Sequence, residues 1–151
     1  MDLAPDFDEF IASLVAHYVE FVIVGAYALA LHGAPRFTGD LDVFVRPTLE
    51  NGSRVLEAVN GFGFPTAHLQ PQDIISADRI LEMGVEPVQI HVMSAISGVS
   101  WDEAWGDRVE APCGRQVVPF LSREMFLRNK RAAGRPKDLA DIDALRDGEE
   151  E

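Results

Sequence analysis

The fold is decided by two neighbouring stretches of the chain, Phe21-Val22-Ile23-Val24-Gly25-Ala26-Tyr27-Ala28-Leu29-Ala30-Leu31-His32-Gly33 and Arg36-Phe37-Thr38-Gly39-Asp40-Leu41-Asp42-Val43-Phe44-Val45. The apolar run 21–24 predicts a short buried strand that ends at Gly25. Residues 26–31 are good helix formers followed by His-Gly, which predicts a helix closed by a glycine. In the second stretch apolar residues alternate with Asp40 and Asp42, as in a half-buried strand. One face of that strand therefore begins with two carboxylates.

The rest of the chain continues the alternation of helices and strands. Helical spacing or composition predicts helices at 6–17, 48–60, 72–77, 101–105, 122–133 and 136–145. Strands are expected at 79–84 and 87–93, and a hairpin is expected from 107–110 and 115–118, around Pro112-Cys113-Gly114. We expect an α+β or α/β domain over residues 1–146, with a small mixed sheet and helices mainly on one side. Residues 147–151 are expected to form a disordered acidic tail.

Length and composition indicate a soluble globular protein. A chain of 151 residues fits one domain, and 47% hydrophobic with 25% charged residues is ordinary for a globular protein. No apolar run approaches the roughly 20 residues that span a bilayer. The first residues lack the features of a signal peptide, and the single Cys113 has no internal disulfide partner. We expect a cytoplasmic protein without a membrane partner.

The charge distribution is uneven along the chain. A formal net charge of −12 opposes non-specific binding to nucleic acid. Six of the thirteen basic residues nevertheless fall within 123–137, namely Arg123, Arg128, Lys130, Arg131, Arg135 and Lys137. Two interpretations remain open, a phosphate-facing patch or a solvated helix face that balances an acidic protein.

The carboxylate pair fits a metal site for phosphoryl transfer. Asp40 and Asp42 lie two residues apart on a strand, so they point the same way with Cα atoms about 6.6 Å apart. Mg²⁺ prefers oxygen ligands, and such ions often act in phosphoryl transfer. Upstream, Gly25 at the start of a helix would let backbone N–H groups approach a phosphate. The alternatives are that the aspartates belong to a turn and that Gly25 only makes a tight strand-to-helix connection.

Taken together, the two opening stretches resemble the start of minimal nucleotidyltransferases of the DNA polymerase β superfamily. The segments 97–105 and 130–138 are similar to those of small bacterial proteins related to abortive-infection nucleotidyltransferase toxins. The resemblance covers most of residues 20–145. It implies a nucleotidyltransferase fold and transfer of a nucleoside monophosphate from an NTP such as ATP to an RNA or protein acceptor. It also implies a cognate antitoxin or another partner protein.

The same resemblance assigns roles to individual residues. Asp40 and Asp42 would bind Mg²⁺ or Mn²⁺. The residues that would contact the nucleotide are Gly25, Ala26, Arg36, Thr38, Lys130, Arg135 and Lys137. An arginine fork suits phosphate oxygens and a lysine acts as a point charge, whereas solvated helix ends are the alternative for the last three.

Two positions depart from the family pattern. Ala26 stands where the family has glycine or serine, and His91 stands where it commonly has a third aspartate. His91 would be catalytic as a softer metal ligand or as a general base, or it is simply a strand residue. The leading hypothesis is therefore a metal-dependent nucleotidyltransferase. Its alternatives are an inactive relative that binds nucleotide or a partner protein, and a structural subunit that needs neither metal nor nucleotide.

Overall fold

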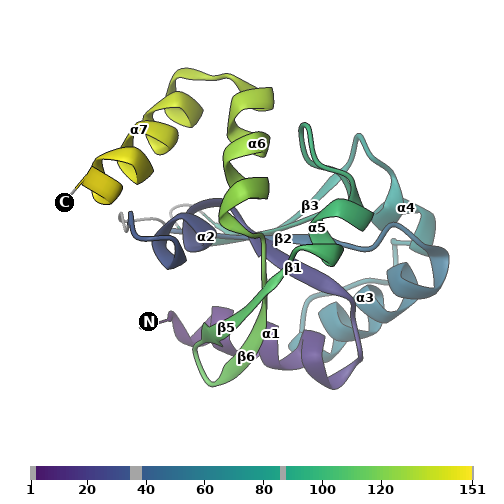
Figure 1. Cartoon of the computed structure of the whole chain (residues 1–151). Coiled ribbons are helices and arrows are strands. Elements are labelled where there is room, and N and C mark those ends of the chain that lie inside the picture. Colours follow the sequence, from purple (N-terminus) through teal and green to yellow (C-terminus); the bar gives the residue numbers. More distant parts are fainter. Residues whose placement is uncertain (1–2, 35–38, 86–87, 151) are drawn as a thin grey trace.

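The computed structural model describes residues 3–34, 39–85 and 88–150, with side chains described as far as Arg146. Helices and strands alternate along these residues (Figure 1). In chain order they are α1 (Pro5–Ala16), β1 (Phe21–Val24), α2 (Gly25–Leu31), β2 (Asp40–Val45), α3 (Leu49–Phe62), α4 (Pro71–Ile75), β3 (Ile80–Val85), β4 (Val88–Met93), α5 (Trp101–Gly106), β5 (Val109–Cys113), β6 (Gln116–Phe120), α6 (Arg123–Ala133) and α7 (Pro136–Glu150).

The strands form one mixed, open sheet in the order β3-β4-β2-β1-β6-β5. Strand β2 runs antiparallel to β1 and parallel to β4, while β1 runs parallel to β6. The outer pairs β3–β4 and β5–β6 are antiparallel. The two carboxylates predicted at the start of β2 therefore lie near the middle of the sheet, between β1 and β4.

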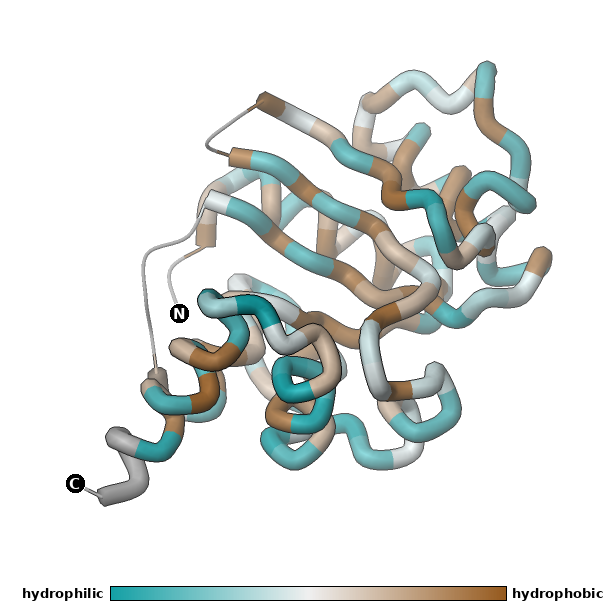
Figure 2. The backbone as a smooth tube through the Cα atoms, turned by 90° about the horizontal axis from the view of Figure 1, so that it is seen from above, coloured by the Kyte–Doolittle hydropathy of each residue, from teal (hydrophilic) through white to brown (hydrophobic). Residues whose placement is uncertain are grey.

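Helices cover the two faces of the sheet unequally. Helices α1, α3 and α4 lie together on one side, and α5, α6 and α7 lie on the other (Figure 1). Figure 2 looks onto the second side and shows several strands that no helix covers beside α6 and α7. No helix in the described ranges is both long and apolar enough to cross a bilayer. The predicted α+β class with a mixed sheet is confirmed, whereas the helices lie on both faces of the sheet and not mainly on one (Figure 1).

The alternation of residues along the strands explains this difference between faces. Leu41 and Val43 of β2 are fully buried, as are Phe10 and Leu14 of α1. The intervening Asp40 and Asp42 are only half-buried. Burial of the apolar face drives the packing, because each fully buried large aliphatic or aromatic side chain contributes roughly 1.5–3 kcal/mol. The polar face is left open toward α6 and α7.

Three boundaries differ from those predicted. Pro112 and Cys113 belong to β5, and the turn follows them; β5 is an edge strand, where a proline without an N–H is tolerated. Gly25 begins α2 instead of only ending β1. Helix α7 continues to Glu150. The backbone of residues 147–150, which was expected to form a disordered tail, is therefore helical. Glutamate is a good helix former, so extending an existing helix through it costs little.

Candidate active site

Strands β2 and β4 bring the predicted catalytic residues side by side. Their parallel register places Asp42 next to His91 and Asp40 next to Gln89. Directly opposed residues of neighbouring strands point to the same face of a sheet, so these four side chains form one polar strip. The prediction that Asp40, Asp42 and His91 lie on neighbouring strands is confirmed.

His91 is hydrogen-bonded through both of its ring nitrogens. Its Nδ1–H donates to Oδ1 of Asp42 over 2.9 Å. Its Nε2 lies 3.1 Å from Oε1 of Gln89. The side chains of His91 and Asp42 are 19% and 24% exposed. The histidine is therefore held within the polar strip and is not a solvent-facing strand residue.

Gly25 meets the same aspartate from the opposite side. Its φ of +67° lies in the left-handed region, which favours glycine. A Cβ atom built on Gly25 would lie 2.2 Å from Oδ2 of Asp42, far inside van der Waals contact. Only a residue without a side chain leaves room for this carboxylate. Sequence analysis assigned Gly25 to phosphate approach and missed this contact, because the contact depends on the pairing of β1 with β2.

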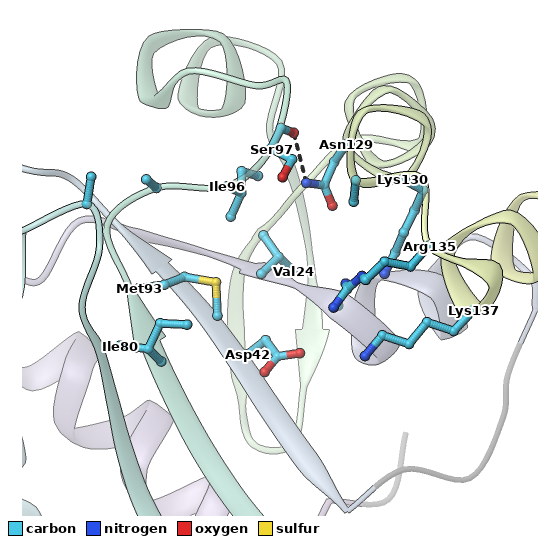
Figure 3. Close-up of a pocket in the computed structure, with 14 residues that line it drawn as sticks. Val24, Asp42, Ile80, Met93, Ile96, Ser97, Asn129, Lys130, Arg135 and Lys137 are labelled. Carbon is cyan, nitrogen blue, oxygen red and sulfur yellow. Dashed lines mark hydrogen bonds between the residues drawn. The ribbon is translucent and has the colours of Figure 1, made fainter.

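A pocket of about 740 Å³ lies between the polar strip and the α6–α7 hairpin. Its residues are Val24, Gly25, Asp42, Ala77, Ile80, Met93, Ala95, Ile96, Ser97, Asn129, Lys130, Ala133, Arg135 and Lys137. In Figure 3 the side chains of Arg135 and Lys137 extend from the α6–α7 side toward the side that carries Asp42. Segments more than 80 residues apart in the sequence thus meet around one cavity.

The pocket gathers some of the predicted site residues and leaves others outside. Gly25, Asp42, Lys130, Arg135 and Lys137 line it. The pocket lining does not include Ala26, Asp40 or His91. The remaining two predicted nucleotide contacts, Arg36 and Thr38, lie outside the described residues.

Two of the three lining cations are ion-paired inside the α6–α7 hairpin. Asp138 is fully buried and accepts hydrogen bonds from Arg135 Nε at 2.7 Å and from Lys130 Nζ at 3.2 Å. It also accepts one from the backbone N–H of Arg135 at 3.1 Å, and Lys130 lies 3.3 Å from Asp141. Burial alone would raise the pKa of Asp138, but the hydrogen bonds from Arg135 and Lys130 lower it to about 2. These carboxylates fix both cations in place.

The sequence analysis assigned no role to Asp138. A signal was present, because Asp138 follows Pro136 in the first turn of a helix, where a carboxylate is favoured and can accept from backbone N–H groups. Lys137 differs from Lys130 and Arg135 in making no ion pair within the part of the chain that the structure describes, and like Arg135 it is exposed. The basic run 123–137 therefore consists of residues with different roles.

Arg128 illustrates a structural role within that run. Its guanidinium pairs with Glu103 of α5, and its Nε donates to the carbonyl oxygen of Gly98 over 2.9 Å. The hydrogen bonds from Arg128 lower the pKa of Glu103 to about 2, and bonds from Ser100 add to this. Arg128 thus ties α6 to the segment before α5, and it is not one of the pocket residues.

The donor set fits a hard divalent ion shared with a substrate. Within residues 3–34, 39–85 and 88–146, no three histidine, cysteine, aspartate or glutamate side chains are grouped to hold a metal ion. Mg²⁺ seldom needs such a cage, because it commonly binds one or two carboxylates together with substrate phosphates and water. Asp40 and Asp42, on the same face of β2, supply that kind of partial site.

A comparison with solved structures identifies the fold. The chain is similar to the crystal structure of a putative nucleotidyltransferase from Thermotoga maritima, with a TM-score of 0.53 and 14% sequence identity over 97% of this chain and 94% of that one. No protein-family model and no curated protein sequence matches the chain. At this identity the likeness establishes the fold alone: the chain has the nucleotidyltransferase fold.

Proposed function

We propose that the protein is a metal-dependent nucleotidyltransferase that transfers a nucleoside monophosphate from an NTP to an acceptor. The observation that carries the proposal is the pocket that holds Asp42 on one side and Lys130, Arg135 and Lys137 on the other. A metal-bound triphosphate needs carboxylates for the ion and cations for the phosphate oxygens. The pocket supplies the cations and one of these carboxylates, Asp42, and Asp40 precedes it on the same face of β2 outside the lining.

The protein's own groups would position the reactants. Asp40 and Asp42 would hold the metal, which when bound supplies charge neutralisation and orients the attacking and leaving oxygens. Arg135 uses Nε and Nη2 for Asp138, so its Nη1 can still donate to a phosphate oxygen. Lys137 adds a mobile ammonium. The oxygen of an acceptor hydroxyl would then bond to the α-phosphorus while the bond to pyrophosphate breaks, and the hydroxyl proton would be released to solvent water.

The neutral part of the pocket fits the nucleoside. Ile80, Met93 and Ile96 supply apolar surface away from the cations (Figure 3). Asn129 Nδ2 donates to the carbonyl oxygen of Ser97 over 2.9 Å, which fixes the amide and leaves its Oδ1 to accept a hydrogen bond. This distribution supports a binding mode in which the base would lie beside the aliphatic side chains and the phosphates beside the α6–α7 hairpin.

The acceptor and the partner follow from the sequence resemblance. We propose an RNA or protein acceptor and a cognate antitoxin or other partner protein. One observation favours a second candidate, an inactive relative that binds nucleotide only: Asp42 already accepts a hydrogen bond from His91, where the family commonly has a third carboxylate. Turnover separates the two candidates.

The test has a binding part and a turnover part. Calorimetry with a non-hydrolysable NTP analogue should show binding that requires Mg²⁺ or Mn²⁺ and that is lost in the variant Asp40→Asn with Asp42→Asn. Glu57→Gln, an exposed carboxylate change on α3, is the matched control and should bind normally. Each labelled NTP is then incubated with the protein, metal and total cellular RNA or protein, and a labelled acceptor is expected. Metal-independent binding, or binding unchanged in the double variant, contradicts the proposal.

A further inference from the structure

We infer that His91 is a positioning residue that orients the carboxylate of Asp42, and that it neither binds the metal nor acts as a base. The inference rests on the proposed function, because it concerns the aspartate assigned to the metal. Its basis is the hydrogen-bonded row Gln89–His91–Asp42 across β4 and β2. Three steps lead to it.

The first step concerns the proton on the ring. An ionised carboxylate only accepts hydrogen bonds, so the 2.9 Å contact with Asp42 Oδ1 requires a proton on Nδ1 of His91. In the neutral ring, Nε2 then carries the lone pair. Gln89 lies 3.1 Å from that nitrogen, and its amide can turn to present its NH₂ group. Both nitrogens are therefore engaged, and neither is available to a metal or to an acceptor hydroxyl without the loss of a hydrogen bond.

The second step concerns access. Asp42 lines the pocket, whereas His91 and Gln89 do not. The link between His91 and the pocket that the structure shows is its hydrogen bond to Oδ1 of Asp42, so an effect of His91 on a ligand is exerted through that carboxylate.

The third step concerns the freedom of Asp42. Its Oδ1 is held by His91, and its Oδ2 occupies the space that a side chain at Gly25 would fill. The carboxylate is thus confined from β4 on one side and from the start of α2 on the other. Hydrogen bonds of this kind orient metal ligands, and loss of such a partner typically costs 10- to 100-fold in metal affinity. The chain has an imidazole N–H donor that orients the proposed metal-binding carboxylate where the resembled family has another carboxylate.

A pair of isosteric substitutions separates the possible roles. The amide nitrogen of asparagine takes the place of Nδ1 of histidine, and that of glutamine takes the place of Nε2. A positioning role through Nδ1 predicts that His91→Asn keeps Mn²⁺ affinity within about 3-fold of wild type, and that His91→Gln lowers it roughly 10-fold or more. Mn²⁺ binding is measured by electron paramagnetic resonance with a non-hydrolysable NTP analogue present. Thermal unfolding of each variant verifies that it is folded.

If His91→Gln keeps the wild-type Mn²⁺ affinity and His91→Asn lowers it, the orienting hydrogen bond comes from Nε2. That result would overturn the inference. Equal affinities in both variants would overturn it as well. Asp42→Asn is the reference for the proposed function itself, and unchanged Mn²⁺ binding in that variant refutes the metal site whatever His91 does.

A second readout does not depend on metal. Nitrogen-15 spectra of the metal-free protein should show His91 with its proton on Nδ1, and His91→Asn assigns this signal among the four histidines. Asp42→Ala should remove the hydrogen-bonded character of that Nδ1 proton. A ring that carries no proton on Nδ1 in the wild-type protein, or a Nδ1 signal that Asp42→Ala leaves unchanged, overturns the inference even if no metal binds.

Discussion

The two sides of the pocket each hold a carboxylate, but they do so in opposite ways. On the α6–α7 side, Asp138 is fully buried between two formal cations, Lys130 and Arg135. On the sheet side, Asp42 is held by the imidazole of His91 and by the space that Gly25 leaves. The charge of Asp138 is compensated inside the protein, whereas Asp42 receives orientation from a neighbour that need not carry charge. The comparison shows that the charge of Asp138 is used within the scaffold, and it supports the proposal that Asp42 serves a ligand.

This difference also divides the basic residues. Asp138 holds Lys130 and Arg135 in place. These two residues therefore contribute hydrogen-bond donors in fixed positions to the pocket more than they contribute net positive charge. Lys137 makes no ion pair among the described residues and supplies a full positive charge. A buried ion pair adds little net stability compared with apolar residues, yet removal of one partner is strongly destabilising because a buried charge remains.

The largest effect is expected from Asp138→Ala. This change leaves Lys130, whose side chain is only 11% exposed, and Arg135 without their shared partner. We expect the free energy of unfolding to fall by about 3 kcal/mol, the lower end of the range for breaking a buried pair, since Asp141 still contacts Lys130. Urea unfolding followed by circular dichroism measures it.

The pH dependence of this loss of stability tests whether lost ion pairs are its cause. The pKa of Asp138 is about 2, below its usual value of 3.8, so its ion pairs stabilise the fold above about pH 4 and are lost as the pH falls toward 2. The difference between wild type and Asp138→Ala should therefore be constant from pH 5 to 7 and shrink below pH 4. A difference that does not depend on pH would mean that lost packing, and not lost charge, is responsible.

Local sequence patterns were sufficient to predict most of the fold. The alternation of Leu41 and Val43 with the two aspartates predicted both the strand and its buried face, and burial follows that pattern. The predictions were wrong where the position of a residue in the tertiary structure decides its local conformation. Pro112 was read as a turn residue, because nothing in the local sequence shows that its strand lies at the sheet edge.

The site was predictable as a set of residues but not as a set of contacts. Asp40, Asp42 and His91 could be placed on one polar face from their period-2 spacing. The hydrogen bond between Asp42 and His91 depends on the parallel register of β2 and β4, and the contact with Gly25 depends on the pairing of β1 with β2. The pairing of Asp138 with Lys130 depends on how α6 and α7 pack. The strand pairings join residues far apart in the chain, and all of these contacts depend on tertiary packing that local patterns in a single sequence do not specify.

The second prediction concerns Gly25→Ala. Alanine at this left-handed position costs roughly 1–2 kcal/mol, and its Cβ must in addition displace Asp42 Oδ2. We expect a loss of about 2 kcal/mol in the free energy of unfolding and a roughly 10-fold weaker Mn²⁺ affinity, because the carboxylate is turned away from His91.

Two other glycines serve as matched controls. Gly134 has a φ of +66°, and a Cβ there would make only an ordinary contact. Gly134→Ala therefore reports the backbone strain alone and should be less destabilising than Gly25→Ala. Gly63 also has a positive φ, and a Cβ there would have no neighbour within 4 Å. Gly63→Ala, at the end of α3, should leave Mn²⁺ affinity intact. Equal losses of affinity in all three variants would show that the effect of Gly25→Ala is a general loss of stability.

The smallest effect is expected from Lys137→Ala, which tests whether the unpaired cation of the α6–α7 side meets the ligand. Lys137 is exposed and lines the pocket, so its removal should not affect folding. An exposed charge pair contributes up to about 1 kcal/mol, so calorimetry should show roughly 3- to 5-fold weaker binding of the NTP analogue. The loss should diminish as salt rises, because ions screen charges near the surface.

Arg131→Ala removes an equal charge from an exposed residue of α6 outside the pocket lining and is the control. If both substitutions weaken binding equally, the ligand responds to the overall charge of the acidic protein. If only Lys137→Ala does, the exposed cation of the α6–α7 side meets the ligand directly, in addition to the donor that Arg135 offers through Nη1.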